Sequence, residues 1–244
     1  MQMPERTVTF KVFRYKQGQD APHYDTFDVP VDEDTTILVA LQTIRRDQDP
    51  TLLLRHSCHH ASCGTCAMLV NGREELSCVV NVLALDRSPV VIEPLRNIPL
   101  VSDLVVDMTD FYARLNPADR PYVRHSEFMP SAQTPDGVDF FSRFENCIEC
   151  GACVSACPIS GTDPDYYGPA ALAAAWRVVE EPRGRQPQDA LNWVDNEKGC
   201  WRCHVAYECT EVCPSDVDPG GKIMALRGEL TKQKLRRFFT FGRG

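Results

Sequence analysis

The twelve cysteines of this chain gather in three clusters, and the spacing within each cluster is that of iron–sulfur ligands. The first cluster follows C-x4-C-x2-C with one further cysteine, the second C-x2-C-x2-C-x3-C and the third C-x2-C-x5-C-x3-C. The first pattern is typical of plant-type [2Fe–2S] ferredoxins and the second of bacterial [4Fe–4S] ferredoxins. Several redox centres in one chain indicate a protein that moves single electrons over a distance. The clusters comprise Cys58, Cys63, Cys66 and Cys78; Cys147, Cys150, Cys153 and Cys157; and Cys200, Cys203, Cys209 and Cys213.

The second and third clusters are related, because each ends in Cys-Pro, as at Pro158. In two-cluster ferredoxins the last cysteine of each run binds the other cluster, so Cys213 is expected to complete the second set and Cys157 the third. When the runs are aligned on Cys-Pro, Ala206 takes the place of Cys150. A missing thiolate favours [3Fe–4S] over [4Fe–4S], with a higher potential that suits electron delivery to a quinone. The predicted sets are Cys58, Cys63, Cys66 and Cys78 for [2Fe–2S]; Cys147, Cys150, Cys153 and Cys213 for [4Fe–4S]; and Cys157, Cys203 and Cys209 for [3Fe–4S].

One cysteine, Cys200, has no place in these sets, and we expect a buried thiol near the last cluster. The alternative is that Cys200 acts as a fourth ligand and the site holds [4Fe–4S]. Zinc usually binds two C-x2-C pairs, which is not the spacing here. A Rieske centre is not expected, because the chain lacks the pair of C-x-H and C-x2-H motifs that binds one. The neighbouring histidines, expected to lie beside the cluster or at the surface, are His56, His59 and His60.

Composition narrows the function further. The chain has 244 residues and a formal net charge of −8, which argues against nucleic-acid binding. Its N-terminus does not resemble an export signal, and no apolar run is long enough to span a bilayer. These features favour a reducing compartment, where clustered cysteines bind metal rather than form disulfides. No paired carboxylates or activated nucleophile occur in a motif, so we expect no catalytic residue.

The first hundred residues predict a small mixed β-sheet with one crossing helix. Polar and apolar residues alternate in the candidate strands, whereas the candidate helix has apolar residues at helical spacing. Asn71-Gly72 is a type I′ hairpin signal, and Cys78 is expected to close the site from the far strand of that hairpin. The expected strands are 7–15, 24–31, 67–70 and 90–92, and the expected helix is 36–46.

The remainder of the chain is predicted to be mainly helical. Residues 102–115 carry a capping serine and helical periodicity, so a linker helix is expected there. Residues 116–140 are rich in Pro, Asp and Ser and predict a surface loop. Three further helices are expected at 169–181, 189–195 and 219–239.

The chain resembles the iron–sulfur subunit of succinate dehydrogenase and fumarate reductase, the respiratory complex II family. The resemblance is carried by RHSCHHASCGTCAMLVNGREELSC (55–78), DLVVDMTDFYARL (103–115), CIECGACVSACP (147–158) and CHVAYECTEVCPSDVDPGGKI (203–223). It implies an α+β fold, with a plant-ferredoxin-like β-grasp domain at 1–105 and a helical, bacterial-ferredoxin-like domain at 106–244. It also implies a flavoprotein partner with covalent FAD and a membrane anchor. Electrons would pass from FAD through [2Fe–2S], [4Fe–4S] and [3Fe–4S] to quinone.

The resemblance also implies roles for residues beside the last cluster. His204 matches a family histidine near [3Fe–4S] and the quinone pocket, and Pro158 and Ala206 are expected beside the cofactors. Residues 168–171 (Gly-Pro-Ala-Ala) favour menaquinone over ubiquinone, and haem b in the anchor is a further expectation. The basic, aromatic segment 234–241 suits a membrane subunit, which places the chain peripherally on the cytoplasmic face of the inner or plasma membrane. Alternatives are a fumarate reductase subunit, a free multi-cluster ferredoxin, and a subunit of a thiol-linked fumarate or heterodisulfide reductase.

Overall fold

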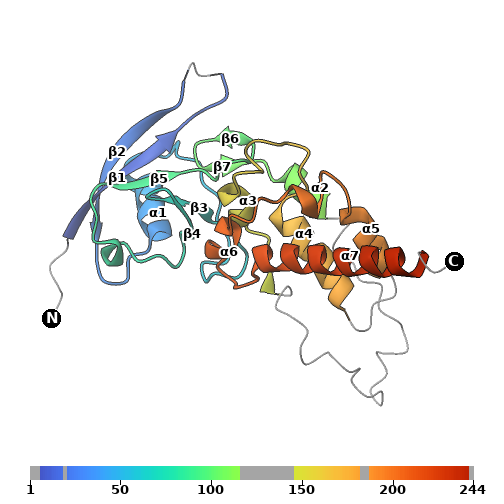
Figure 1. Cartoon of the computed structure of the whole chain (residues 1–244). Helices are drawn as coiled ribbons and strands as arrows, with labels where there is room; N and C mark the ends of the chain where they lie inside the picture. Colours follow the sequence, from blue (N-terminus) through green and yellow to red (C-terminus); the bar gives the residue numbers. More distant parts are fainter. Residues whose placement is uncertain (1–5, 19–20, 116–145, 182–186, 242–244) are drawn as a thin grey trace, which may run out of the picture. The chain divides into compact units, whose positions relative to one another are not determined.

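A computed structural model describes residues 6–18, 21–115, 146–181 and 187–241 (Figure 1). The chain forms two compact units, each made of two segments. The first unit comprises Met1–Met108 and Ile148–Ala156, and the second comprises Thr109–Cys147 and Cys157–Gly244. The surface loop predicted for residues 116–140 lies outside the described residues.

The first unit contains the sheet and two helices, whereas helices dominate the second. The elements of the first unit are β1 (Arg6–Arg14), β2 (His23–Val31), α1 (Ile37–Asp47), β3 (Ala67–Val70), β4 (Arg73–Leu76), β5 (Val90–Glu93), β6 (Leu100–Ser102), β7 (Val105–Val106) and α3 (Ala152–Ala156). Those of the second are α2 (Thr109–Leu115), α4 (Pro169–Glu180), α5 (Pro187–Val194), α6 (Glu208–Glu211) and α7 (Pro219–Phe241). Two 3₁₀ turns also lie in the described part of the chain, at Leu83–Leu85 and Cys200–Arg202.

The sheet of the first unit has the strand order β2-β1-β5-β3-β4. β1 is antiparallel to β2 and parallel to β5, and β3 is antiparallel to both β4 and β5, so the sheet is mixed as predicted. Helix α1 begins after Thr36, whose Oγ1 accepts a hydrogen bond from the Val39 N–H at 3.3 Å. The apolar face of α1, including Leu41 and Ile44, is fully buried, as its helical spacing requires.

A buried ion cluster around Arg14 joins β1 to the segment that leads into the first cysteine loop. Arg14 is only 5% exposed, and its guanidinium contacts the carboxylates of Asp25, Asp49 and Asp103. Asp103 is fully buried and also accepts a hydrogen bond from the Leu53 N–H at 2.9 Å. A buried charge must be paired and hydrogen-bonded to be tolerated, so these contacts hold the segment before Cys58 against the sheet.

The linker helix predicted for residues 102–115 is wrong in its first half. Residues 100–106 form the antiparallel pair β6–β7, and only Thr109–Leu115 is helical. Asp103 adopts a left-handed φ of 45° in the turn between these strands, and its carboxylate is engaged by Arg14. The hydrogen bonds that Asp103 makes with distant parts of the chain therefore override the local helical pattern.

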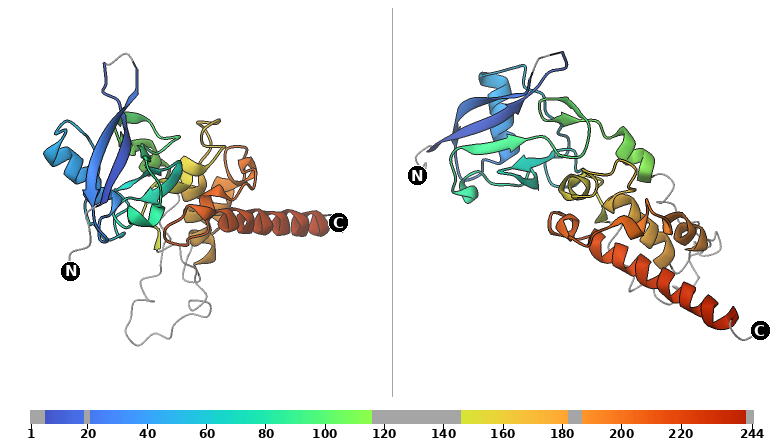
Figure 2. Two further views of the ribbon diagram at one scale, coloured as in Figure 1. Left: turned by 90° about the vertical axis from the view of Figure 1, so that its left-hand side faces the viewer. Right: turned by 45° about the horizontal axis from the view of Figure 1, so that its top comes forward.

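The second unit is built on α4, α5 and α7, and the helices expected at 169–181, 189–195 and 219–239 are confirmed. Helix α4 packs against both α5 and α7 (Figure 2). Most of the residues that α4 buries are alanines. Small side chains allow the helix backbones to approach closely. Leu172 of α4 and Ile223 and Leu226 of α7 are fully buried. Pro169 occupies the first turn of α4, where its missing N–H costs nothing.

The segment 148–156 belongs to the first unit, although it follows part of the second unit in the sequence. No sequence pattern predicts this assignment. Helix α3 is attached there through Ser155, whose hydroxyl donates to Glu74 Oε1 at 2.7 Å and accepts from the Arg96 N–H at 2.8 Å. The Asn97 side chain donates to the Ser155 carbonyl at 2.8 Å. These hydrogen bonds are buried or partly buried, so the segment that carries two of the cysteines is anchored on the β-sheet unit.

Candidate iron–sulfur sites

The loop between α1 and β3 arranges its backbone N–H groups around cysteine sulfur atoms. Cys58 Sγ accepts hydrogen bonds from the N–H groups of Ser62 and Cys63, both at 3.3 Å, and from His60 at 3.5 Å. Cys78 Sγ accepts one from the Ala61 N–H at 3.3 Å. A loop whose amides converge on sulfur is what a [2Fe–2S] site with thiolate ligands requires, because hydrogen bonds to sulfur stabilise its negative charge.

Several residues of this loop adopt left-handed backbone conformations, which curl the chain around its centre. His59 has φ of 65°, Ala61 59° and Gly64 68°. Such conformations are costly for residues other than glycine and are typical of functional loops. Their effect is visible at Cys58, where the hydrogen bond from the His60 N–H, assisted by those from Cys63 and Ser62, lowers the pKa to about 7. The Cys58 thiol is therefore readily ionised, as a metal ligand must be.

Cys66 and Cys78 form the buried side of the same site. They lie just before β3 and just after β4, the two strands that the Asn71-Gly72 turn joins as predicted. The buried Ser77 ties them together, because both its N–H and its hydroxyl donate to the Cys66 carbonyl. Burial raises the pKa of Cys66 to about 11. A cationic iron centre would offset this cost, so the residues fit a [2Fe–2S] cluster.

The histidines of the loop are not arranged as cluster ligands. His56 and His59 contact each other, with Nδ1 and Nε2 3.1 Å apart. The Nδ1 atom of His60 lies 2.6 Å from the Cys58 carbonyl oxygen. His59 and His60 are exposed and His56 is half-buried, in agreement with the expected surface or neighbouring role.

Gly64 marks the point where the first cysteine loop meets the segment carrying Cys150. A Cβ atom at Gly64 would lie 2.6 Å from the Ile148 carbonyl oxygen and 2.7 Å from Cys150 Cβ. Both distances are far below van der Waals contact, so only glycine fits. The two cysteine-bearing segments of the first unit are therefore packed directly against each other at this residue.

The cysteines predicted for the [4Fe–4S] centre are divided between the two units. Cys150 and Cys153 belong to the first unit and Cys147 and Cys213 to the second, and all four side chains are half-buried. In the second unit, the Val217 N–H donates to Cys213 Sγ at 3.4 Å, which is the same kind of contact that surrounds Cys58. The common ligand set of these four cysteines stays a prediction.

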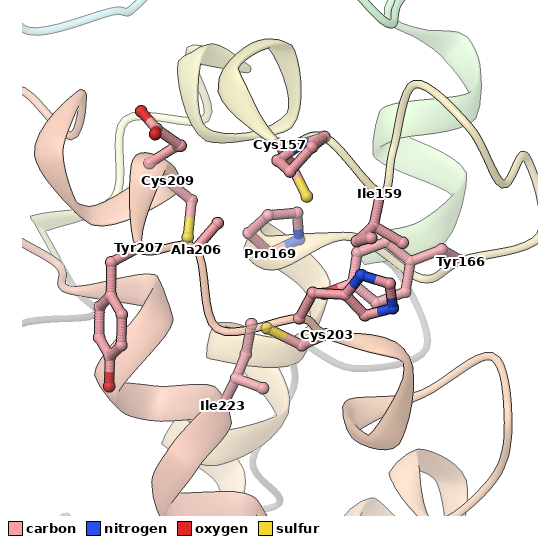
Figure 3. A pocket seen from close by; sticks show the side chains of 12 residues that line it. Cys157, Ile159, Tyr166, Pro169, Cys203, Ala206, Tyr207, Cys209 and Ile223 are labelled. Atoms are coloured by element: carbon pink, nitrogen blue, oxygen red, sulfur yellow. The ribbon is translucent and has the colours of Figure 1, made fainter.

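The three cysteines predicted for [3Fe–4S] line a single pocket in the second unit. The pocket encloses about 310 Å³, including space open to solvent, and the sulfur atoms of Cys157, Cys203 and Cys209 point into it (Figure 3). Ala206, which replaces the expected fourth cysteine, lines the same pocket, as do the predicted neighbours Pro158 and His204. The pocket therefore brings together three thiols and a methyl group where a complete ferredoxin run would have four thiols.

The segment that carries Cys203 is held in an unusual backbone conformation. Val205 and Tyr207 both have φ of 62°, which is strained for a β-branched or aromatic residue. The Val205 N–H donates to Cys203 Sγ at 3.3 Å. Arg227, on α7, donates to the carbonyls of Cys200, Trp201 and Cys203, which fixes the start of the segment.

The chemistry of these thiols also fits an iron cluster. Burial, followed by the negative charges of Cys157 and Cys203, raises the pKa of Cys209 to about 12. Without a cation, three thiolates would repel one another in this pocket. Iron ions supply the compensating positive charge, so the donor set suits a thiolate-bound cluster.

Cys200 does not line this pocket. It lies in the 3₁₀ turn Cys200–Arg202, is fully buried, and has its pKa raised to about 11 mainly by burial. Within this stretch of the chain, Cys203 is the first residue that lines the pocket. This position agrees with the expected buried thiol near the last cluster and gives no support to Cys200 as a fourth ligand.

Two residues near the pocket were missed by sequence reasoning. Arg227 clamps the Cys203 segment, and Tyr166 is a fully buried side chain that lines the pocket. No motif links either residue to Cys203, because they lie far from it along the chain. The one sequence signal near Tyr166 is the Gly168-Pro169 pair, which marks the start of the buried helix α4.

Comparisons with known proteins agree with this arrangement. Residues 9–113 match the family model described as "2Fe-2S iron-sulfur cluster binding domain", and residues 143–217 match that described as "4Fe-4S dicluster domain". The fold is similar to a chain of the "Mycobacterium smegmatis Sdh1 complex in the apo form", with a TM-score of 0.85 and 21% identity over 95% of this chain and 98% of that chain.

Named relatives cover nearly the whole chain. The fumarate reductase iron-sulfur subunit of Mycobacterium tuberculosis is 35% identical, over 97% of this chain and 98% of that protein. That of Escherichia coli is 36% identical, over 94% and 96%. The succinate dehydrogenase iron-sulfur subunit of Coxiella burnetii is 30% identical, over 93% and 98%.

The fold and the cysteine sites define an electron-transfer protein of the α+β class, with a ferredoxin-like [2Fe–2S] domain followed by a helical dicluster domain. The chain belongs to the family of iron–sulfur subunits of succinate dehydrogenase and fumarate reductase. It is thus one subunit of an oxidoreductase complex, in which its role is to transfer electrons.

Proposed function

We propose that the chain carries electrons one at a time between the FAD of a flavoprotein subunit and a membrane quinone, through [2Fe–2S], [4Fe–4S] and [3Fe–4S] centres in that order. The observation that carries this proposal is the pocket with three cysteines and Ala206. A terminal centre with three thiolate ligands has the higher potential that electron delivery to quinone requires. The proposed ligands are the eleven cysteines predicted above, with Cys200 excluded.

A bound cluster would supply a site that accepts and releases one electron with little change of structure. The protein contributes the surroundings that hold and shield it. N–H groups such as that of Val205 stabilise the negative charge on sulfur, and the Arg227 clamp keeps Cys203 in place. Ile159 and Ile223, both buried, line the pocket with apolar side chains that exclude water.

The C-terminal half of α7 supports a membrane-anchor partner. Among the described residues, Leu235, Phe238 and Phe239 are 52%, 74% and 68% exposed. Exposed apolar side chains of this size on one helix end indicate a surface that another subunit covers. One basic residue of this segment already has a partner within the chain, because Lys234 Nζ lies 2.6 Å from Asp195 Oδ1. The aromatic residues therefore support docking more than the basic ones.

The anchor supplies the membrane part of the proposed complex. No helix in the described ranges is long and apolar enough to cross a bilayer. We infer a peripheral position on the cytoplasmic face, with haem b, where present, bound by the anchor. The quinone would lie near His204, an exposed residue at the mouth of the pocket. The Gly-Pro-Ala-Ala run at 168–171 favours menaquinone as the quinone.

Succinate oxidation is the proposed direction, and fumarate reduction is the second candidate. A specific observation favours the second, because the fumarate reductase relatives named above are 35% and 36% identical whereas the succinate dehydrogenase relative is 30% identical. The rates of succinate oxidation by menaquinone and of fumarate reduction by menaquinol, measured in one preparation, decide between them.

Cluster content tests the proposal directly. The purified complex is expected to contain about nine irons per copy of this chain, the sum of the three centres. The oxidised complex should give a [3Fe–4S] EPR signal at about g = 2, which disappears on reduction with succinate. Stoichiometric zinc would instead favour a zinc protein. A monodisperse chain that carries all its clusters without a partner would favour a free ferredoxin.

A pair of substitutions tests the ligand count at the last centre. Ala206→Cys is expected to convert the site to [4Fe–4S], because it places a thiol at the vacant corner of the pocket. The g = 2 signal should disappear, the potential of the centre should fall, and quinone reduction should slow. Cys200→Ser should leave the signal and the activity intact. If Cys200→Ser instead creates a g = 2 signal that the wild type lacks, Cys200 is a ligand and the assignment is wrong.

A further inference from the structure

The Tyr166 hydroxyl is a buried polar group with no ordinary partner. The side chain is fully buried, and within the described part of the chain its hydroxyl oxygen makes no hydrogen bond of normal geometry. Leaving a buried hydroxyl unsatisfied costs about 1–3 kcal/mol, so native proteins seldom retain such a group without a ligand or a functional reason.

The surroundings of the hydroxyl indicate which acceptor it serves. Tyr166 lines the same pocket as Cys157, Cys203 and Cys209, and Figure 3 shows it beside Cys203. A phenol is protonated at neutral pH and a thiolate sulfur can only accept, so the hydroxyl would act as a donor toward sulfur. Ile159 and Pro169 offer no side-chain acceptor, and the hydroxyl makes no hydrogen bond to His204 or Glu208, which also line the pocket.

The backbone of Tyr166 is fixed on both sides, so its position does not depend on a mobile loop. Arg114 donates to the Tyr166 carbonyl at 2.8 Å and to the Pro164 carbonyl at 2.6 Å. The Tyr166 N–H donates to the Asp163 carbonyl at 3.2 Å. The next side chain, Tyr167, stacks on Trp193 with ring centroids 4.5 Å apart. A donor held in this way is oriented before a cluster binds.

We propose that Tyr166 donates a hydrogen bond to sulfur at the Cys203 corner of the [3Fe–4S] centre and thereby raises its reduction potential. This inference rests on the proposed function, which assigns that centre to the pocket. Reduction adds one electron and makes the sulfur atoms more negative, so a donor stabilises the reduced state more than the oxidised state. The hydrogen stays on the tyrosine oxygen throughout. Tyr166 is thus a positioning and tuning residue for the last electron-transfer step.

The test compares three variants in the assembled complex by EPR-monitored redox titration. Tyr166→Phe removes only the hydroxyl and should make reduction of the centre about tenfold less favourable, a fall of about 59 mV for one electron. Tyr166→Met removes the same hydroxyl with a flexible side chain and should also lower the midpoint. The control is Tyr167→Phe, which removes a hydroxyl that accepts a hydrogen bond from Asn196 Nδ2 at 3.2 Å and should leave the midpoint unchanged.

The outcomes separate this inference from the proposed function. A g = 2 signal of full intensity with the same midpoint in wild type and Tyr166→Phe overturns the inference and leaves the proposed function standing. A midpoint that falls equally in the Tyr167→Phe control also overturns it. Absence of a g = 2 signal in the wild type overturns the proposed function itself, and the inference with it.

Discussion

In the assembled complex, Cys203→Ala is expected to stop quinone reduction while succinate continues to reduce a soluble dye that accepts electrons from the flavin. Cys203 supplies one of the three sulfur atoms that point into the pocket of the described second unit, so its loss should remove the proposed [3Fe–4S] centre. Alanine is the better replacement here, because a serine oxygen could still bind iron. Quinone reductase activity should fall by about a hundredfold or more, which corresponds to about 2.7 kcal/mol in the barrier.

Two comparisons make this prediction specific. Cys200→Ala removes a buried thiol from the same stretch of chain but outside the pocket lining, and it should keep quinone reduction near the wild-type rate. Cys58→Ala, at the other end of the relay, should stop electron entry to all three centres, so that succinate reduces neither the g = 2 signal nor quinone. If Cys58→Ala and Cys203→Ala give the same EPR and quinone behaviour in intact complexes, the linear order of the centres is wrong.

The second large effect is expected at Gly64, where Gly64→Ala should cost the protein at least one complete centre. The added Cβ would lie 2.6 Å from the Ile148 carbonyl oxygen and 2.7 Å from Cys150 Cβ, so one of the two cysteine-bearing segments must move. Displacement of Cys150 removes a proposed [4Fe–4S] ligand. Iron content is therefore expected to fall from about nine to about five or fewer per chain.

A matched control separates this steric effect from the cost of a left-handed backbone. Gly72 has φ of 85°, and a Cβ there would meet nothing closer than Arg96 Nη2 at 3.8 Å. Gly72→Ala thus shares the conformational cost of about 1–2 kcal/mol but not the clash. It should keep its iron and lose only some thermal stability. Full iron loading in Gly64→Ala, measured together with the reduced-state EPR signals, would contradict the close packing of the two segments.

The sequence by itself determined the features that depend on neighbours along the chain. The cysteine spacings identified the three clusters, because ligands a few residues apart must converge within one loop. The alternation at 7–15 and 24–31 predicted β1 and β2, and the Asn71-Gly72 pair predicted the hairpin that separates Cys66 from Cys78. Alignment on Cys-Pro also predicted Ala206 at the place of a fourth ligand, and Ala206 lines the pocket with the three cysteines.

The tertiary structure decided the features that depend on residues distant in the sequence. Asp103 turns residues 100–106 into a strand pair because its partners Arg14 and Leu53 come from other segments. The contact of Gly64 with Cys150 and the placement of Tyr166 in the last pocket are likewise long-range. Periodicity and spacing report only local geometry, whereas burial and hydrogen-bond satisfaction are properties of the packed chain. Candidate ligands could therefore be predicted from the sequence, but the groups that pack around them emerged only from the fold.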